Sequence, residues 1–491
     1  MVDNKIELNR QKTLSYLILS SDLITPVSAL LRLSTLAGND PKNIFLLESV
    51  QGNAARARYS IIGLLPDKIW RCKSGVVSIN CNPLLDPECF FEEDRAPLDS
   101  LREFIAESQL EIPDGVPPMV GGIYGYLGYD LVRQMEDLPY PPPNDLDLPE
   151  GLMLRPSLFA VFDTIKDEIT LAVPLRKGTE DEVKSAKILL QKAQLALNTS
   201  TASLNYGGFL PSKKVNIDST FSKAKFIEVI QKIKDYIYAG DVFQVVPSQR
   251  FSCSFTASPI ALYRALRRIN PAPFLFCLQL DGFSLVGSSP EILVRLREKV
   301  VTVRPLAGTR PRGKTRQEDL ELENSLLADK KELSEHLMLI DLGRNDVGRV
   351  CEIGSVKVTE KFVIERFSHV MHISSNVEGT IKKNLDALDA LIAGFPAGTL
   401  TGAPKIRAME ILDEVEPTQR ATYAGCIGYF GADGSMDTCI GLRTGLIKDQ
   451  KLYVQAGCGV VAESDPELEY EETIHKAKAL FKAAEEAYKF I

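Results

Sequence analysis

Four separated blocks in the second half of the chain carry residue types that can do metal-assisted chemistry. Two of them, residues 332–336 and 466–472, contain Glu-x-x-Glu, a spacing that places two carboxylates on one side of a helix. The other two, residues 304–310 and 396–405, are rich in Gly and Thr and contain Arg or Lys. Carboxylates suit a hard cation, whereas backbone amides and cationic side chains suit an anion. The combination predicts metal-assisted chemistry on a carboxylate or phosphate substrate.

Regular elements must hold these blocks in place. Runs of strands interrupted by helices predict an α+β fold with antiparallel sheets. The strands that the pattern predicts are 45–49, 58–64, 158–163, 168–173, 242–246, 274–280, 291–296 and 300–303. The helices that it predicts are 180–197, 317–340, 403–414, 466–490 and one between an N-cap at Ser222 and a terminating Gly240.

The chain has 491 residues, which is too long for one domain of roughly 100–200 residues. The polar stretch 198–219 is the best candidate for a linker. It predicts an N-terminal domain over 13–197 and a catalytic domain over 220–488, although strands of both halves can share one sheet.

Composition excludes several classes of protein. The net charge is −8 with no long basic run, which argues against a nucleic-acid-binding protein. No stretch of about 20 apolar residues and no apolar leader is present, so we expect neither a membrane span nor a signal peptide. The nine Cys are widely spaced without C-x-x-C, which predicts reduced thiols in a cytoplasmic protein and no zinc site.

Residues 308–315 match the P-loop pattern G-x-x-x-x-G-K-[ST]. Pro311 removes one backbone N–H from the loop that would hold phosphates, and no clear strand ending in a Walker-B Asp follows. A nucleotide-binding regulator is therefore a distant alternative.

The four blocks, together with residues 341–346 and 369–372, resemble the chorismate-utilising enzymes. The resemblance covers essentially the whole chain and is densest from about 222 to 485. It implies the fold of that family, with antiparallel β-sheets packed as a sandwich, helices outside and two interwoven subdomains. Within the family, the residues are most similar to those of the anthranilate synthases.

The resemblance implies a Mg²⁺ site. Glu335 and Glu472 fall at the ligand positions of the family, with Glu332 and Glu469 beside them. Mg²⁺ can bridge the ring carboxylate of chorismate to protein carboxylates that would otherwise repel it.

Substrate contacts follow from the same resemblance. Arg443 and Tyr423 match positions that hold the enolpyruvyl carboxylate, and Arg can pair a carboxylate in two parallel bonds. The full set of predicted substrate-binding residues is Gly308, Thr309, Tyr423, Arg443, Gly457, Cys458, Gly459 and Lys476. Cys458 can also be read as a nucleophile, but a small residue in a tight strand is the better interpretation.

Three further positions match catalytic residues of the family. Glu291 matches the general acid that protonates the departing C4 hydroxyl. His372 matches a residue tied to pyruvate elimination, and Thr399 matches an active-site hydroxyl.

Two positions discriminate among family members. Gln244 stands where the isochorismate-forming relatives carry a Lys base, and Ala307 stands where aminodeoxychorismate synthase carries a Lys. Both point to a lyase that converts chorismate and ammonia to anthranilate and pyruvate, the first committed step of tryptophan biosynthesis. Aminodeoxychorismate synthase remains the alternative. No block resembles a glutaminase, so the resemblance implies a partner glutamine amidotransferase subunit.

Residues 46–49 resemble the tryptophan feedback motif of the family, whose other half, Asn-Pro-Ser-Pro-Tyr, reads Asn-Pro-Ala-Pro-Phe over 270–274. Two hydroxyls are lost, so we expect tryptophan to bind as an inhibitor with weakened hydrogen bonding. The predicted contacts are Leu47, Glu48, Ser49, Ser60, Asn270, Pro271, Ala272 and Pro273.

Overall fold

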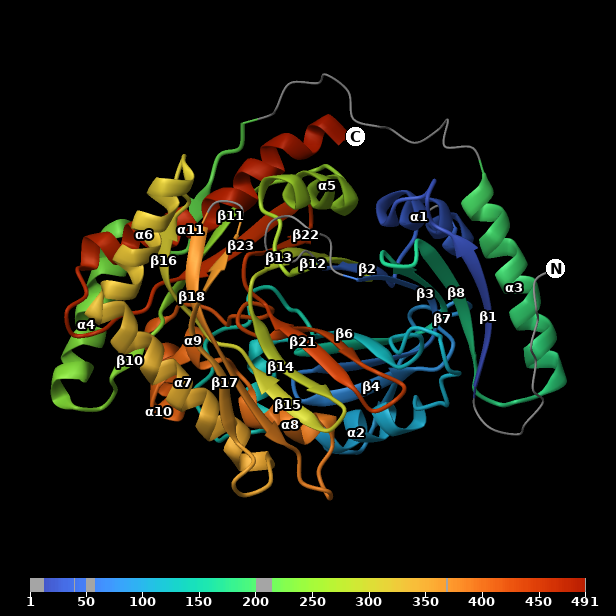
Figure 1. Cartoon of the computed structure of the whole chain (residues 1–491), viewed down its shortest axis with the longest axis horizontal. Coiled ribbons are helices and arrows are strands. Elements are labelled where there is room, and N and C mark those ends of the chain that lie inside the picture. The colour runs from blue at the N-terminus through green and yellow to red at the C-terminus, as the bar shows by residue number, and fades with distance from the viewer. Residues whose placement is uncertain (1–12, 39, 50–57, 200–213, 368–369, 491) are drawn as a thin grey trace.

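The computed structural model describes residues 13–490 except 39, 50–57, 200–213 and 368–369 (Figure 1). Its strands form one extended hydrogen-bonded network and a separate two-stranded pair. The N-terminal half contributes β1 (Thr13–Ser20), β2 (Ile44–Glu48), β3 (Tyr59–Lys73), β4 (Val76–Asn80), β5 (Phe91–Glu93), β6 (Ile123–Leu127), β7 (Gly151–Asp163) and β8 (Glu168–Leu175).

The C-terminal half contributes the remaining strands. They are β9 (Asp218–Ser219), β10 (Gln244–Val245), β11 (Ser248–Ser254), β12 (Phe274–Gln279), β13 (Ser284–Ser289), β14 (Ile292–Arg297), β15 (Val300–Val303), β16 (Leu306–Pro311), β17 (Lys357–Arg366), β18 (Val370–Thr380), β19 (Gly402–Ala403), β20 (Cys426–Phe430), β21 (Met436–Ile440), β22 (Thr444–Lys448) and β23 (Lys451–Gly457).

The two halves of the chain share one sheet system. Strand β2 pairs antiparallel with β12, and β6 pairs antiparallel with β20. These pairings confirm the interwoven antiparallel architecture. The predicted boundary at 198–219 stays a prediction, because most of that stretch lies outside the described residues.

Alternating side chains build a sandwich with helices outside. In β2, Phe45 packs into a core formed by strands and loops, whereas Leu46 packs into a core shared with helices. Strand β12 does the same with Phe276 and Cys277. This period of two is the geometry of a β-strand, and it lets each strand serve two cores.

The helices flank these sheets (Figure 1). They are α1 (Pro26–Leu33), α2 (Pro97–Glu107), α3 (Glu180–Asn198), α4 (Lys223–Ala239), α5 (Pro259–Ile269), α6 (Arg316–Ala328), α7 (Lys330–Val350), α8 (Ala387–Gly394), α9 (Gly398–Thr401), α10 (Lys405–Val415) and α11 (Pro466–Ala487), with short 3₁₀ turns at Ser34–Ala37, Tyr129–Gln134 and Tyr488–Phe490.

Local capping explains where the helices begin and end. Ser222 accepts a hydrogen bond from the Lys225 amide, and Gly240 takes φ +86°, so the predicted ends of α4 are confirmed. The single helix predicted over 317–340 is wrong. Asp329 ends α6 and caps α7, because its carboxylate accepts from the amides of Lys331 at 3.0 Å and Glu332 at 3.3 Å.

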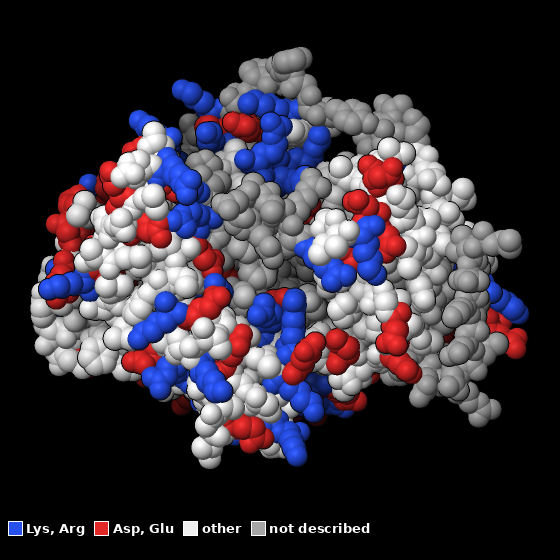
Figure 2. All heavy atoms as spheres, in the orientation of Figure 1, with Lys and Arg blue, Asp and Glu red and all other residues white. Residues whose placement is uncertain are grey.

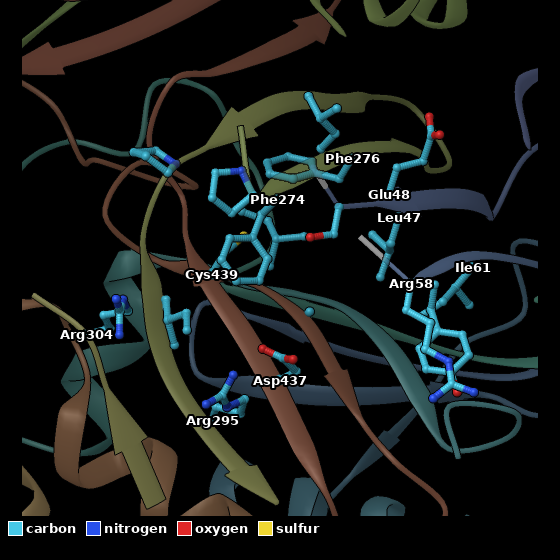
Figure 3. Close-up of a pocket in the computed structure, with 18 of the residues that line it drawn as sticks. Leu47, Glu48, Arg58, Ile61, Phe274, Phe276, Arg295, Arg304, Asp437 and Cys439 are labelled. Atoms are coloured by element: carbon cyan, nitrogen blue, oxygen red, sulfur yellow. The ribbon is translucent and has the colours of Figure 1, made fainter. Parts of the chain in front are cut away.

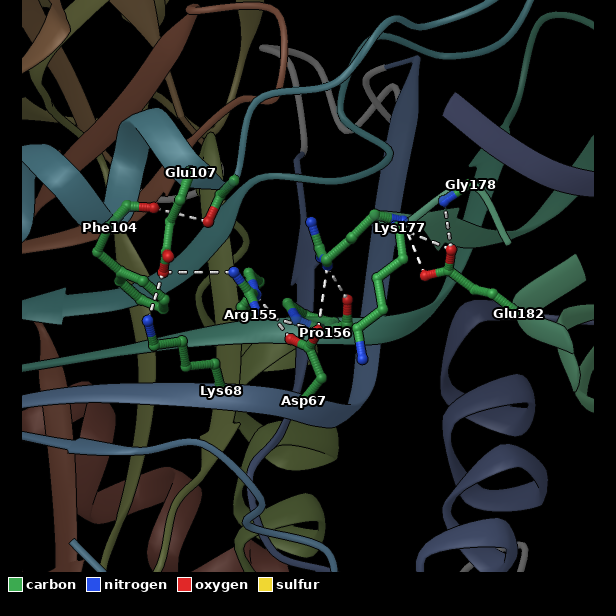
Figure 4. A network of polar contacts seen from close by, with 11 residues as sticks. Asp67, Lys68, Phe104, Glu107, Arg155, Pro156, Lys177, Gly178 and Glu182 are labelled. Atoms are coloured by element: carbon green, nitrogen blue, oxygen red, sulfur yellow. Dashed lines mark hydrogen bonds and ion pairs between the residues drawn. The ribbon is translucent and has the colours of Figure 1, made fainter. Parts of the chain in front are cut away.

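An arginine-centred network fastens helix α2 to the sheet in the N-terminal half (Figure 4). Arg155 donates to Asp67 at 2.7 and 3.1 Å and lies 3.3 Å from the Glu107 carboxylate. Lys68 donates to the same Glu107 at 2.7 Å. This cluster joins β3, β7 and α2 through groups that are half-buried.

Acidic and basic side chains are interspersed over the face shown in Figure 2, in line with the modest net charge of −8. Across the described part of the chain, none of the helices is long and apolar enough to span a membrane.

Candidate active site

The predicted carboxylates stand at the beginnings of two helices. Asp329 caps α7, and Asp465 caps α11 by accepting from the amides of Glu467 and Leu468. Both Glu-x-x-Glu pairs therefore fall in the first two turns of their helices. The cap residues fix the phase of each helix and so fix which way its carboxylates point.

The four carboxylates differ in their surroundings. Burial raises the pKa of Glu335, and the nearby carboxylates of Glu332 and Glu472 raise it further, while a hydrogen bond from Gln244 opposes the rise. That bond joins Gln244 Nε2 to Glu335 Oε1 at 3.0 Å. Burial also raises the pKa of Glu469. Close carboxylates of this kind are stabilised by a cation.

Two of these carboxylates suit a hard cation best. The carboxylate of Glu472 on α11 contributes to the raised pKa of Glu335 on α7, so the two acidic groups repel each other in the absence of a cation. No cluster of three or more His, Cys, Asp or Glu side chains with metal-binding geometry occurs among the described residues. Mg²⁺ needs no such cluster, because it is usually held by one or two carboxylates together with substrate and water. The donor set therefore fits Mg²⁺.

Glu291 lies between β13 and β14 and is buried. Its Oε1 accepts from Thr399 Oγ1 at 3.2 Å and from the Leu306 amide at 3.4 Å. Burial raises its pKa to about 8, against the opposing effect of these bonds and of Arg443. The carboxyl group is therefore largely protonated at neutral pH and is able to donate a proton.

His372 on β18 is a neutral imidazole with one free nitrogen. A bulge in the pairing of β16 with β18 falls between Ala307 and Arg310, and it brings the Gly308 carbonyl to 2.8 Å from His372 Nδ1. A carbonyl only accepts, so Nδ1 carries the proton. Nε2 is buried and has no hydrogen-bond partner among the described residues. Burial and the charge of Arg443 lower the pKa to about 4.

A cationic side chain is available to an anion beside these groups. Arg443 takes φ +49°, a strained conformation for a residue with a side chain. Its guanidinium makes no hydrogen bond or ion pair with any described residue. Its positive charge lowers the pKa of both Glu291 and His372. Lys476 donates to the Gly457 carbonyl at 2.9 Å and to Glu472 at 2.7 Å. Arg443 is thus free to bind a substrate carboxylate.

Two glycines let backbone segments approach closely. A Cβ on Gly457 would lie 2.6 Å from the Pro247 carbonyl and 2.9 Å from the Tyr423 hydroxyl. A Cβ on Gly459 would lie 2.7 Å from Gln244 Nε2. Cys458 between them is fully buried, and burial raises the pKa of its thiol well above the usual value. It lies one residue beyond the end of β23, so the predicted position within a strand is wrong by one residue, and its thiol is not an activated nucleophile.

The P-loop match is not a phosphate cradle. The Gly313 amide donates to Asp319 at 2.8 Å, and Arg312 forms an ion pair with the same carboxylate at 2.8 Å. Thr309 Oγ1 lies 3.1 Å from His372 Nδ1. The polar groups of this loop therefore already bind Asp319 and His372.

The structure brings most of the predicted site residues together. Direct bonds join Glu291 to Thr399, Gly308 and Thr309 to His372, and Lys476 to Gly457. Sequence reasoning missed the bond between Gln244 and Glu335, because it treated Gln244 only as the replacement for a base.

A cavity of about 940 Å³ opens beside the predicted tryptophan motif (Figure 3). Leu47, Glu48, Ser49 and Pro273 line it, whereas Ser60, Asn270, Pro271 and Ala272 do not. Arg295, Arg304 and Asp437 line the part farther from Leu47 in Figure 3.

Two of the predicted tryptophan contacts already have protein partners. Glu48 is buried and accepts from Arg267 at 3.0 Å and from the Tyr263 hydroxyl. The Asn270 carbonyl accepts from the Ser288 hydroxyl. These three bonds hold the middle and the C-terminal end of α5 against the sheet.

Comparison with known proteins agrees with this geometry. The model of the chorismate binding enzyme family matches residues 64–482. The chain belongs to this family. Among its relatives, anthranilate synthase component 1 of Cereibacter sphaeroides is 50% identical over 97% of this chain and 95% of the relative. The same component of Pseudomonas aeruginosa is 47% identical over 94% and 93%.

Two solved structures have the same fold as this chain. The crystal structure of anthranilate synthase component I from Streptococcus pneumoniae superposes with a TM-score of 0.78 at 35% identity, covering 94% of this chain and 99% of that one. The menaquinone-specific isochorismate synthase from Escherichia coli superposes with a TM-score of 0.71 at 20% identity, covering 98% and 96%. At that identity the second likeness concerns the fold alone.

Proposed function

We propose that this chain is the chorismate-binding subunit of an anthranilate synthase. It would convert chorismate and ammonia to anthranilate and pyruvate, and so act as a lyase at the first committed step of tryptophan biosynthesis. The observation that carries the proposal is the similarity, at 45–50% identity over nearly the whole chain, to curated relatives named anthranilate synthase component 1.

Two side chains favour ammonia as the nucleophile. Gln244 is an amide that donates to Glu335, and an amide cannot act as a base at neutral pH, which disfavours attack by water. Ala307 offers no amine for covalent attack. These residues favour anthranilate synthase over aminodeoxychorismate synthase and over the isochorismate-forming relatives.

The first half of the reaction uses Glu291. Ammonia forms a bond to C2 of chorismate as the C4 hydroxyl departs, and the neutral Glu291 carboxyl donates the proton that releases it as water. The double bond shifts in the ring, the ammonium group formed at C2 loses one proton, which balances the proton given by Glu291, and the product is aminodeoxyisochorismate. Arg443 and Tyr423 would hold the enolpyruvyl carboxylate, and burial of Glu291 keeps its proton in place at neutral pH.

The second half aromatises the ring. The C2 proton leaves, the bond to the enolpyruvyl oxygen breaks, and a proton added to the enolpyruvyl methylene carbon gives pyruvate. His372 supports this half, because its buried Nε2 is an acceptor with no partner among the described residues. Its low pKa keeps that nitrogen unprotonated throughout the neutral range.

Magnesium is proposed as the cofactor. Glu335 and Glu472 would hold it, with Glu332 and Glu469 beside them, and bound Mg²⁺ would neutralise the repulsion between the ring carboxylate of chorismate and these carboxylates. Gln244 would keep Glu335 oriented.

Two partners are part of the proposal. The relatives are named component 1, which supports a second component, and we propose a glutamine amidotransferase subunit that supplies ammonia. We also propose that tryptophan binds in the 940 Å³ cavity beside Leu47 and Ser49 as a feedback inhibitor.

All nine cysteines are unpaired, which supports a reducing, cytoplasmic location.

The proposal is tested with the purified chain, chorismate, Mg²⁺ and ammonium at high pH. Mass spectrometry and fluorescence identify the products. Anthranilate with pyruvate is the expected result, while aminodeoxychorismate or isochorismate would assign the chain to a sister activity.

A further inference from the structure

A buried ion pair lies just after helix α10. Glu416 caps the end of α10, Arg420 follows four residues later, and their side chains are only 4% and 2% exposed. Arg420 Nε donates to Glu416 Oε2 at 2.8 Å, and Nη2 donates to Glu416 Oε1 at 2.6 Å. A buried pair is weak evidence for stability, because desolvation offsets most of the attraction. Its further contacts therefore decide what it does.

The guanidinium joins two segments that carry the candidate active site. Nη1 donates to the Leu400 carbonyl at 2.6 Å, and Nη2 donates to the Val246 carbonyl at 2.7 Å. Leu400 follows Thr399, whose hydroxyl bonds Glu291. Val246 lies two residues beyond Gln244, which bonds Glu335. The Arg420 guanidinium thus connects the segment of Thr399, which bonds the proposed acid, with the segment of Gln244, which bonds the proposed metal ligand.

The partner carboxylate adds a third segment. Glu416 Oε1 accepts from both the amide and the hydroxyl of Ser248, each at 2.8 Å. Ser248 is the register partner of Gly457, where a Cβ would strike the Pro247 carbonyl. The backbone around Gly457 is therefore placed against a strand that Glu416 holds.

The same guanidinium also fixes an aromatic ring. Its central carbon lies 5.5 Å from the ring centre of Tyr423 and 5.0 Å from that of Tyr129. A guanidinium stacked on an aromatic face gains both charge and contact energy. Tyr423 is the residue proposed to hold the enolpyruvyl carboxylate, so its ring position depends on Arg420.

We propose that Arg420 and Glu416 are positioning residues, which hold the Thr399 loop, the Gln244 segment and the Tyr423 ring in one fixed arrangement. They touch no substrate atom and act through Glu291, Glu335 and Tyr423. The expected effects on kcat and KM for chorismate rest on the proposed function. Lysine cannot replace Arg420, because one ammonium group cannot reach the carbonyls of Val246 and Leu400 and both oxygens of Glu416 in one plane.

The test compares Arg420→Lys with a matched control, Arg155→Lys. Arg155 is also a largely buried arginine that binds several acceptors, and its partners Asp67 and Glu107 belong to β3 and α2 (Figure 4). Melting temperature, kcat and KM for chorismate are measured for both variants at saturating ammonium and Mg²⁺. Both substitutions should lower the melting temperature.

Only Arg420→Lys should change the chemistry of the folded enzyme. We expect kcat to fall by roughly 10- to 100-fold, because a displacement of about 1 Å at the reacting groups has an effect of that order. KM for chorismate should rise as Tyr423 loses its support, while Arg155→Lys should keep both constants within about twofold of wild type. Equal kcat and KM in the two variants would overturn the proposal.

A second variant covers the case in which Arg420→Lys does not fold. Glu416→Gln keeps an oxygen for Ser248 and removes the charge that orients Arg420, so kcat should fall at least several-fold. An unchanged kcat in Glu416→Gln would overturn the proposal as well.

The outcome is separable from the identity of the product. If wild-type protein makes another product from chorismate, the same variants are compared on that product. If wild-type protein consumes no chorismate, calorimetric affinities for chorismate replace the rates, and equal affinities of Arg420→Lys and Arg155→Lys reject the positioning role.

Discussion

The sharpest single prediction concerns the proton on Glu291. A pKa raised from 4.5 to about 8 means that burial makes the ionised form less favourable by about 5 kcal/mol, at about 1.4 kcal/mol per pH unit. Glu291→Gln has almost the same shape and cannot ionise or donate an acidic proton. The substitution removes the proposed acid and leaves the packing in place.

We expect turnover of Glu291→Gln to fall by about 10²- to 10⁴-fold, the usual contribution of a general acid. This loss corresponds to about 3 to 5 kcal/mol of transition-state stabilisation. Wild-type kcat should decline above about pH 8, where the carboxyl ionises, and this alkaline decline should disappear in the variant. Steady-state anthranilate fluorescence from pH 6 to 9.5, at a constant concentration of free ammonia, measures both effects.

The substitution that lowers turnover should raise the stability of the folded protein at alkaline pH. The folded-state pKa is raised, so folded Glu291 binds more protons than unfolded Glu291 between about pH 4.5 and 8, and its contribution to stability is lost as pH rises through that window. The denaturation midpoint of wild type should therefore fall between pH 5 and pH 9 by more than the midpoint of Glu291→Gln. The variant should gain stability relative to wild type as the pH rises.

A control separates this effect from the loss of any partly buried carboxylate that accepts hydrogen bonds. Glu150→Gln removes a carboxylate that accepts from the amides of Ser74 and Gly75 in the N-terminal half, and kcat should stay unchanged. Full turnover in Glu291→Gln, or an alkaline decline that persists in it, would refute the assignment of the acid.

Three further predictions concern the other parts of the site. Glu335→Gln should raise the Mg²⁺ concentration for half-maximal activity by roughly tenfold or more, because one of two ligand carboxylates is lost; a Mg²⁺ titration that superposes on wild type would contradict the metal assignment. His372→Asn removes the buried Nε2 acceptor, so chorismate consumption should outrun pyruvate release and an aminated intermediate should accumulate in quenched samples, whereas equal slowing of both steps would exclude this role. Saturating tryptophan should inhibit the wild type, and Leu47→Trp, which places a bulky ring in the part of the cavity beside Ser49, should keep activity and lose inhibition; activity indifferent to tryptophan in wild type would end the feedback proposal.

Local signals in the sequence predicted much of the scaffold. Ser222 and Gly240 bracket α4 because a side-chain cap and a left-handed terminal residue act over a few residues. The same kind of signal was misread at Asp329, where one residue both ends a helix and caps the next. Periodicity alone joins two such helices, since each keeps the same spacing.

Long-range pairing could not be predicted from local pattern. The antiparallel partners β6 and β20 are about 300 residues apart, and the residue pattern of neither strand indicates which strand it pairs with. The contact of Arg420 with the Leu400 and Val246 carbonyls is equally invisible, because backbone carbonyls carry no sequence signal. The tryptophan motif located the cavity through Leu47, Ser49 and Pro273, but Asn270 is turned to Ser288 and does not line it.

The central claim is that ammonia is the nucleophile and that the ring is aromatised in the same site. It is tested most directly by supplying ¹⁵N-ammonium, Mg²⁺ and chorismate to the purified chain and analysing the products by mass spectrometry. The account predicts anthranilate that carries one ¹⁵N atom, formed together with an equal amount of pyruvate. Isochorismate without nitrogen, or an aminated product that retains the enolpyruvyl group, would contradict it.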